Sequence, residues 1–97
     1  MKVYSLFDTQ FGIYSDPFLS ADDLSAERLT IQTAEVSEGL RARLHVMALY
    51  YLADFNPSAS DVSPLSAGDS AELVSSPERL VKLLEQSVQM NKEVTNG

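Results

Sequence analysis

Apolar positions in the first 18 residues form two short runs separated by turn-forming residues, the pattern of a β-hairpin. Residues 2–8 are typical of a strand that is partly apolar on both faces. Gly12 can adopt positive φ without steric cost, so it favours a turn after this strand. Residues 13–14 start a short second strand, which ends before Pro17 because proline cannot donate a hydrogen bond to a sheet.

The strongest strand pattern runs from Leu44 to Phe55. Its alternate positions are largely apolar on both faces, and Tyr50 and Tyr51 point to opposite faces. This pattern predicts a central strand that is covered on both sides, or on one side with a partner on the other. We expect Leu49 and Leu52 to lie in the core.

Between these strands, capping residues predict a helix from about Ala21 to Ser37. Ser20 is the expected N-cap, two carboxylates follow it beside the positive end of the helix dipole, and Gly39 suits the position just beyond the helix end. The β-branched residues of this segment leave a strand over residues 29–36 as the alternative.

The chain changes character after residue 56. Residues 57–76 are rich in serine and poor in large apolar groups, which is typical of a connector. Ser76-Pro77 then forms a cap followed by proline, the combination that often begins a helix. An apolar stripe predicts an amphipathic helix over residues 77–92. The stripe consists of Leu80, Leu84 and Val88.

These elements predict a small α+β domain with an antiparallel sheet made from the N-terminal hairpin and a central third strand. One helix lies between the strands, and an amphipathic helix ends the fold. Residues 1–56 form the expected α+β core, 57–76 the Ser-rich connector and 77–92 the terminal helix. A chain of 97 residues is enough for a single domain of this kind.

Acidic residues outnumber basic residues by 14 to 7, which gives a net charge of −7 at pH 7. The excess is spread along the chain, so no basic domain remains once an acidic tail is set aside. Proteins that bind nucleic acid through its phosphates normally present a basic field. The charge therefore counts against nucleic-acid binding, except through a local basic patch.

The chain has no cysteine, which excludes disulfides, thiolate catalysis and iron–sulfur or zinc–sulfur sites. No apolar stretch is long enough for a signal peptide or a membrane span. These features favour a soluble cytoplasmic protein that does not act at a membrane.

Five short segments stand out by their order and spacing within residues 1–56. They are Met1-Lys2-Val3-Tyr4-Ser5-Leu6-Phe7-Asp8, Gly12-Ile13-Tyr14, Pro17-Phe18, Ala26-Glu27-Arg28 and Ala48-Leu49-Tyr50-Tyr51-Leu52-Ala53-Asp54-Phe55-Asn56. Together they resemble the small nonstructural proteins of gokushovirus-type microviruses, which are phages with single-stranded DNA genomes. One departure is Ala53-Asp54-Phe55-Asn56, where members of the family often have Gly-Glu-Phe-Asp.

The resemblance implies a phage nonstructural protein of the host cytoplasm, connected with genome replication or single-stranded DNA packaging. A role in binding single-stranded DNA is often proposed for the family. Its partners would be single-stranded DNA or a phage or host protein of replication or packaging. The family offers no catalytic residues to transfer, and the resemblance does not extend to residues 57–97.

The approach to the central strand holds the best candidate for a nucleic-acid site. If this segment is extended, Arg41, Arg43 and His45 point to one side together with Tyr51, where they could hold a phosphate and stack a base. The alternative is a polar strand end that pairs with Glu35, Glu38 or Asp54. The expected nucleic-acid contacts are Lys2, Arg28, Arg41, Arg43 and Tyr51.

The other polar candidates favour structural roles. His45 is the only histidine, and a lone histidine without a clear carboxylate set makes a poor metal site. Asp22 and Asp23 could hold a divalent ion, but their place at a helix start explains them. No serine has the spacing of a nucleophile elbow, and no Gly-rich phosphate loop is present. We therefore expect no enzyme, no cofactor and no metal.

The terminal helix and the charge leave two hypotheses about partners. Leu80, Leu84 and Val88 pack on a sheet face, or they form a homodimer or partner interface. A phage protein that binds single-stranded DNA is the first functional hypothesis. The second is an acidic module that binds a basic phage or host protein, including by mimicry of nucleic acid. A basic cluster on one face favours the first and a continuous acidic face the second.

Overall fold

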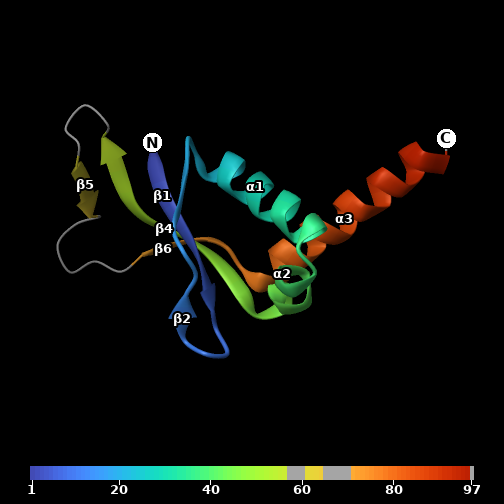
Figure 1. The fold of residues 1–97 in the computed structure, drawn as a ribbon, viewed down its shortest axis with the longest axis horizontal. Coiled ribbons are helices and arrows are strands. Elements are labelled where there is room, and N and C mark those ends of the chain that lie inside the picture. Colours follow the sequence, from blue (N-terminus) through green and yellow to red (C-terminus); the bar gives the residue numbers. More distant parts are fainter. Residues whose placement is uncertain (57–60, 65–70, 97) are drawn as a thin grey trace.

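The computed structural model describes residues 1–56, 61–64 and 71–96, and describes side chains for residues 1–55 and 71–90. It confirms the expected α+β fold (Figure 1). The described strands are β1 (Lys2–Asp8), β2 (Ile13–Tyr14), β3 (Phe18–Ser20), β4 (Met47–Asn56), β5 (Asp61–Pro64) and β6 (Glu72–Ser75). The described helices are α1 (Asp23–Val36), α2 (Glu38–Arg43), the 3₁₀ turn η1 (Leu44–Val46) and α3 (Pro77–Asn96).

The sheet is built around the antiparallel pair β1 and β4. β2 and β3 both pair with the outer edge of β1, and β5 and β6 both pair with the outer edge of β4. All of these pairings are antiparallel. The predicted hairpin and central strand are therefore present, and the sheet also gains β3, β5 and β6.

The turn between β1 and β2 forms because Asp8 satisfies its backbone donors. One carboxylate oxygen of Asp8 accepts hydrogen bonds from the amides of Gln10 and Phe11, each at 2.9 Å. Gly12 follows with a φ of 71°, a conformation that most other residues adopt only with strain. The sequence predicted this turn and its glycine.

Helix α1 confirms the helical interpretation of residues 29–36 and excludes a strand there. The N-cap is Asp22 rather than Ser20, since the Asp22 side chain accepts a hydrogen bond of 2.8 Å from the amide of Ser25. Thr30 is tolerated inside the helix because its hydroxyl donates to the carbonyl of Ala26. Gly39 does not end α1, because Ser37 both closes α1 and caps α2.

The expected strand start at Leu44 was wrong. The chain from Glu38 to Arg43 is helical, and η1 follows before β4 begins at Met47. Ser37 accepts a hydrogen bond from the amide of Leu40 and so nucleates α2 directly after α1. The chain then needs a tight turn to enter the sheet, and η1 provides that turn while burying Leu44.

One face of the sheet carries the hydrophobic core, and we call it the covered face. Tyr4 and Leu6 of β1 and Leu49 of β4 point into it and are buried. Helix residues close it from above. They include Ala26, Ile31, Ala34, Leu44, Leu80 and Leu84. Leu49 is in the core as predicted, but Leu52 is only partly buried because β4 has a bulge beside it.

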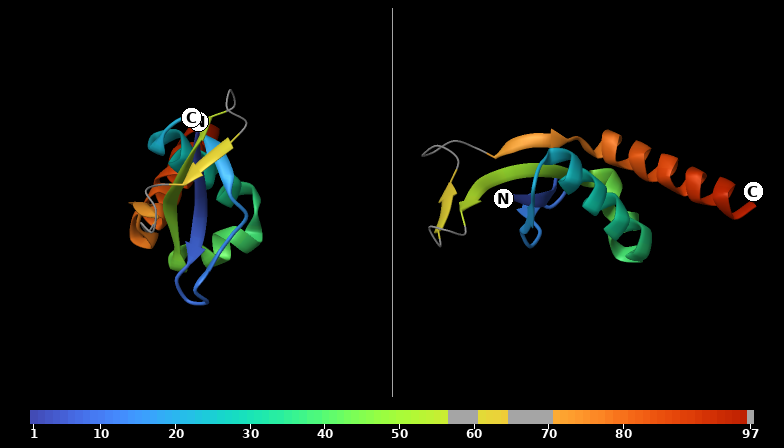
Figure 2. Two further views of the ribbon diagram at one scale, coloured as in Figure 1. Left: turned by 90° about the vertical axis from the view of Figure 1, so that its left-hand side faces the viewer. Right: turned by 90° about the horizontal axis from the view of Figure 1, so that it is seen from above.

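The C-terminal part of the chain adds strands and a long helix. The expected connector includes β5 and β6, and β6 pairs with the centre of β4. Helix α3 starts at Pro77 as predicted, and the Ser76 hydroxyl accepts from the amide of Arg79. Its first turns pack on α1 and η1, and the helix then extends away from the other elements (Figures 1 and 2). It reaches Asn96, beyond the expected end at residue 92.

Candidate interaction surfaces

The two arginines expected in an extended approach to the central strand lie on α2 instead, so they do not align with Tyr51. Arg43 forms an ion pair of 2.6 Å with Asp8, and its guanidinium lies 4.6 Å from the centroid of the Phe11 ring. Arg41 donates a hydrogen bond to the backbone carbonyl of Glu35. The expected alternation on one side of an extended strand was therefore wrong, because this segment is helical.

Lys2 and Tyr51 lie at the opposite end of the sheet. Lys2 pairs with Asp54 in the register, whereas Asp8, the partner of Arg43, pairs with Met47. Lys2 and Asp8 are six positions apart along β1, a distance of roughly 20 Å. The Lys2 ammonium lies 5.1 Å from the centroid of the Tyr51 ring, so these two predicted contacts do meet.

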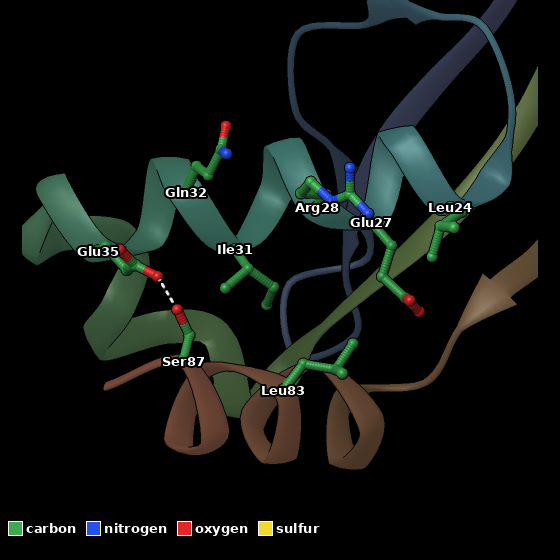
Figure 3. A pocket seen from close by; sticks show the side chains of 8 residues that line it. All are labelled: Leu24, Glu27, Arg28, Ile31, Gln32, Glu35, Leu83 and Ser87. Atoms are coloured by element: carbon green, nitrogen blue, oxygen red, sulfur yellow. Dashed lines mark hydrogen bonds between the residues drawn. The ribbon is translucent and has the colours of Figure 1, made fainter. Parts of the chain in front are cut away.

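Arg28 occupies a third place, on α1. It lines a pocket between α1 and α3 together with Leu24, Gln32 and Leu83 (Figure 3). The five predicted nucleic-acid contacts thus come from several elements: Arg41 and Arg43 from α2, Arg28 from α1, and Lys2 and Tyr51 from β1 and β4. They do not form the basic cluster on one face that direct phosphate binding needs.

Four carboxylates lie around the neighbouring rings of Tyr4 and Tyr51, and we call them the acidic edge. They are Asp22, Asp23, Asp54 and Glu72, and all four are exposed. Tyr51 donates a hydrogen bond to Asp54 and pairs with Glu72 in the register between β4 and β6. The buried Tyr4, whose ring centroid lies 5.7 Å from that of Tyr51, donates a 2.6 Å hydrogen bond to Asp23.

The pKa values of both tyrosines are raised, in part by these carboxylates. The hydrogen bond to Asp54, with burial and the nearby charges of Glu72 and Asp23, raises the pKa of Tyr51 to about 12. Burial and the hydrogen bond to Asp23 raise the pKa of Tyr4 above its ordinary value. Both hydroxyls therefore remain protonated and keep donating to the carboxylates.

The acidic edge does not form a metal site. In the described part of the chain, no group of three or more histidine, cysteine or acidic side chains is placed to hold a metal ion. Asp22 is occupied as the N-cap of α1, and the amide of Ser25 lowers the pKa of its carboxyl. The carboxylates thus form a spread surface rather than a coordination cage.

The pocket between α1 and α3 is bounded by polar contacts between two helices that run in the same direction. Glu27 of α1 accepts two hydrogen bonds from the Arg79 guanidinium, at 2.6 and 3.0 Å, and a third from the Ser75 hydroxyl. Two turns further along, Ser87 of α3 donates to Glu35 of α1 (Figure 3). These contacts fix α3 on α1, so Glu27, Glu35 and Ser87 of this pocket have structural roles.

Burial alone would raise the pKa of Glu27, but the hydrogen bonds from Arg79 and Ser75 outweigh it. They hold the pKa of this carboxyl below its ordinary value, so Glu27 stays charged although it is almost fully buried. The ion pair is the main polar link between α1 and the C-terminal helix. The sequence offered no signal for it, because its partners are 52 residues apart.

The face of the sheet opposite the core has no helix over it among the described elements, and we call it the open face. In the left view of Figure 2 the strands lie toward the viewer and the helices behind them. The register places nine residues of the described side chains on this face. They are Val3, Ser5, Phe7, Tyr14, Leu19, Ala48, Tyr50, Ala53 and Leu73.

Tyr50 and Tyr51 point to opposite faces, as predicted. Tyr51 contacts Tyr4 on the covered face, whereas Tyr50 packs against Phe7 and Tyr14 on the open face.

The expected interface residues Leu80 and Leu84 are buried within the chain, so only Val88 of that stripe is exposed. Among the described residues, no helix is both long enough and apolar enough to cross a membrane.

Comparisons with known proteins give no further guide. No protein-family model matches the chain, and no significant match appears among curated proteins or solved structures. The function must therefore be argued from the surfaces themselves.

Proposed function

We propose that this chain is an acidic protein-interaction module that binds a basic protein through the acidic edge. The observation that carries this proposal is the environment of Tyr51. The ring expected to stack on a DNA base lies among carboxylates from α1, β4 and β6, and its hydroxyl is committed to Asp54. A phosphate brought to this ring would meet negative charge.

The balance of charge at this edge supports a cationic partner. Two bases accompany the four exposed carboxylates: Lys2, which lies over the Tyr51 ring, and Arg28, whose charge, like that of Lys2, helps to lower the pKa of Asp22. Elsewhere, Arg43 is paired with Asp8 and Arg79 with Glu27, so these arginines add little to a basic field. Arginine and lysine side chains of a partner would find a surface of net negative charge here, which steers association and favours specific pairing.

The acidic edge is also partly organised before any partner binds. The Tyr4 and Tyr51 hydroxyls hold the carboxylates of Asp23 and Asp54 in place. A fixed carboxylate loses less side-chain entropy on binding, which increases the affinity for an arginine or lysine. In the phage setting that the resemblance implies, the partner is a basic capsid, replication or packaging protein, or a host protein in the cytoplasm.

Titration with two fluorescent probes tests this proposal. One probe is a ten-residue oligolysine peptide and the other is a single-stranded oligo-dT of about 15 nucleotides, each at about 50 mM and about 150 mM salt. We expect the chain to bind the peptide with salt-dependent affinity and to leave the oligonucleotide unbound at the higher salt.

Two double variants distinguish binding at the acidic edge from a non-specific effect of the overall negative charge. Asp54→Asn/Glu72→Gln removes two charges at the edge, and Glu78→Gln/Glu85→Gln removes two exposed charges from α3. The edge variant should weaken peptide binding about tenfold, and the α3 variant by no more than about twofold. Equal weakening in both variants contradicts a defined site. Tighter binding of the oligonucleotide than of the peptide supports the DNA hypothesis instead.

A further inference from the structure

We propose that a second copy of this chain covers the open face, so that two sheets pack face to face in a symmetric dimer. This inference does not depend on the acidic edge, which lies on the other side of the sheet. It concerns the largest apolar surface that the described helices leave uncovered.

The open face is apolar and partly exposed to solvent. Leu73 is 56% exposed, Tyr14 48% and Leu19 43%, and each lies on a different strand. These residues surround smaller side chains that are already buried, such as Ala48. A contiguous apolar area of this kind on a small protein marks an interaction surface.

Three aromatic rings form the centre of the open face. The ring centroids of Phe7 and Tyr14 are 4.7 Å apart, and the Tyr50 ring stands edge-on to both at about 6 Å. The three residues come from three adjacent strands, β2, β1 and β4. Packed rings lose little conformational entropy on association, so this cluster is suited to the middle of an interface.

The distribution of charge on the sheet favours a second copy of this chain, rather than a basic protein, on the open face. None of its nine residues is charged, whereas Lys2, Asp8, Asp54 and Glu72 of the same strands point to the covered face. A basic protein would find no carboxylate here. Two copies, each with a net charge of −7, can meet on this face because their strand carboxylates point away from it.

The geometry of paired sheets fits the same occupant. Two sheets pack with about 10 Å between them when alternate side chains of each point inward. A two-fold axis would bring each aromatic cluster against the aliphatic residues or the rings of the other copy, and a self-complementary patch of this kind is what a symmetric dimer needs.

The size of the open face predicts a reversible dimer. Along the strands, the seven residues of β1 span roughly 23 Å. Across the sheet, four strands lying side by side span roughly 19 Å. The resulting patch of roughly 400 Å² is well below the ~800 Å² per partner of a stable complex. Association should therefore depend on concentration, with dissociation in the micromolar range or weaker.

Sedimentation velocity tests the dimer on the whole chain. Between about 5 µM and about 500 µM, the average mass should rise from that of one 10.6 kDa chain towards twice that mass. Leu73→Lys should abolish the rise, because it would place an ammonium group in an apolar contact. Met90→Lys is the matched control, since Met90 is an exposed apolar residue of α3 and lies outside the open face.

A second charge variant tests the same surface. Leu73→Lys and Leu73→Glu chains should each remain monomeric, since a charge of either sign would be placed in the apolar contact. Circular dichroism melts of the variants at low concentration show whether each one folds. A wild-type chain that stays monomeric to about 500 µM overturns the proposal. So does a dimer that survives Leu73→Lys, or one that only Met90→Lys disrupts, since the last result places the interface on α3.

Discussion

The two faces of this sheet come from the same strands, but helices cover one of them and leave the other in contact with solvent. The covered face holds Tyr4, Leu6 and Leu49 under three helices, and its polar groups are tied by specific hydrogen bonds. The open face holds Phe7, Tyr14 and Tyr50, which contact one another and solvent. The difference shows that an apolar strand face need not belong to the folding core. It also separates residues that hold the fold from residues available for association.

The largest effect should come from placing a charge under the helices. Leu84 is 8% exposed and packs in the core, so Leu84→Asp buries an unpaired carboxylate and should cost more than about 4 kcal/mol or unfold the chain. Urea unfolding followed by circular dichroism measures the loss. Met90→Asp on the same helix, where the side chain is 65% exposed, should change stability by no more than ~0.5 kcal/mol. Similar losses for the two variants would show that Leu84 is not a core residue.

The next largest effect concerns the ion pair that joins α1 to α3. Arg79→Gln leaves the buried Glu27 carboxylate without its charged partner and should lower the urea midpoint at pH 7, though less than Leu84→Asp because Arg79 itself is half-exposed. Lys82→Gln, which also removes one base from α3, serves as the control and should cost less than ~0.5 kcal/mol.

The Glu27–Arg79 ion pair also predicts how stability depends on pH: stability falls as the pH is lowered. The folded pKa of Glu27 lies below its ordinary value of 4.5, so its stabilisation is complete above pH 4.5 and disappears as the pH falls through the folded pKa. The wild-type chain should therefore lose more stability between pH 5 and pH 3 than Arg79→Gln does. An identical acid profile for both would show that Glu27 gains nothing from Arg79.

A smaller effect compares one hydroxyl on each face. Tyr4→Phe keeps the buried ring but removes the hydrogen bond to Asp23, and should cost about 1 kcal/mol. Tyr50→Phe on the open face should cost less than half as much in the same unfolding assay. A larger loss at Tyr50 than at Tyr4 would reverse the assignment of the two faces.

The smallest effect on folding belongs to the open face. Leu73→Lys should change the stability of a dilute sample by no more than ~0.5 kcal/mol, because Leu73 is already half-exposed in the single chain. Thermal melts at a concentration well below that of association provide the measurement. A loss of several kcal/mol would mean that Leu73 supports the monomer itself.

Local patterns were sufficient to predict the hairpin, α1 and the start of α3. Gly12 and Ser76-Pro77 impose their conformations through neighbours in the chain, and these signals were correct. The segment from Arg41 to His45 was misread because alternation in a short polar stretch does not distinguish strand from helix. Ser37, which caps α2 immediately after α1, was the residue that decided it.

The candidate surfaces were harder to predict because their members are distant in the sequence. The carboxylates around Tyr51 come from α1, β4 and β6, and only the sheet register brings Glu72 beside the ring. The alternation in β4 correctly placed Tyr50 and Tyr51 on opposite faces. It could not indicate which face the helices would cover, since that depends on how α1 and α3 pack after the strands have paired.

The contacts between α1 and α3 have a mechanical consequence. Glu27–Arg79 and Ser87–Glu35 both join residues 52 positions apart, so the two helices are held in one rotational and axial register. A single residue inserted between Arg79 and Ser87 would turn the rest of α3 by about 100° and shift it by about 1.5 Å. The direction in which this 20-residue helix leaves the domain is therefore set by its first turns. The helix acts as a stiff arm of roughly 30 Å that holds its far end at a defined position relative to the sheet.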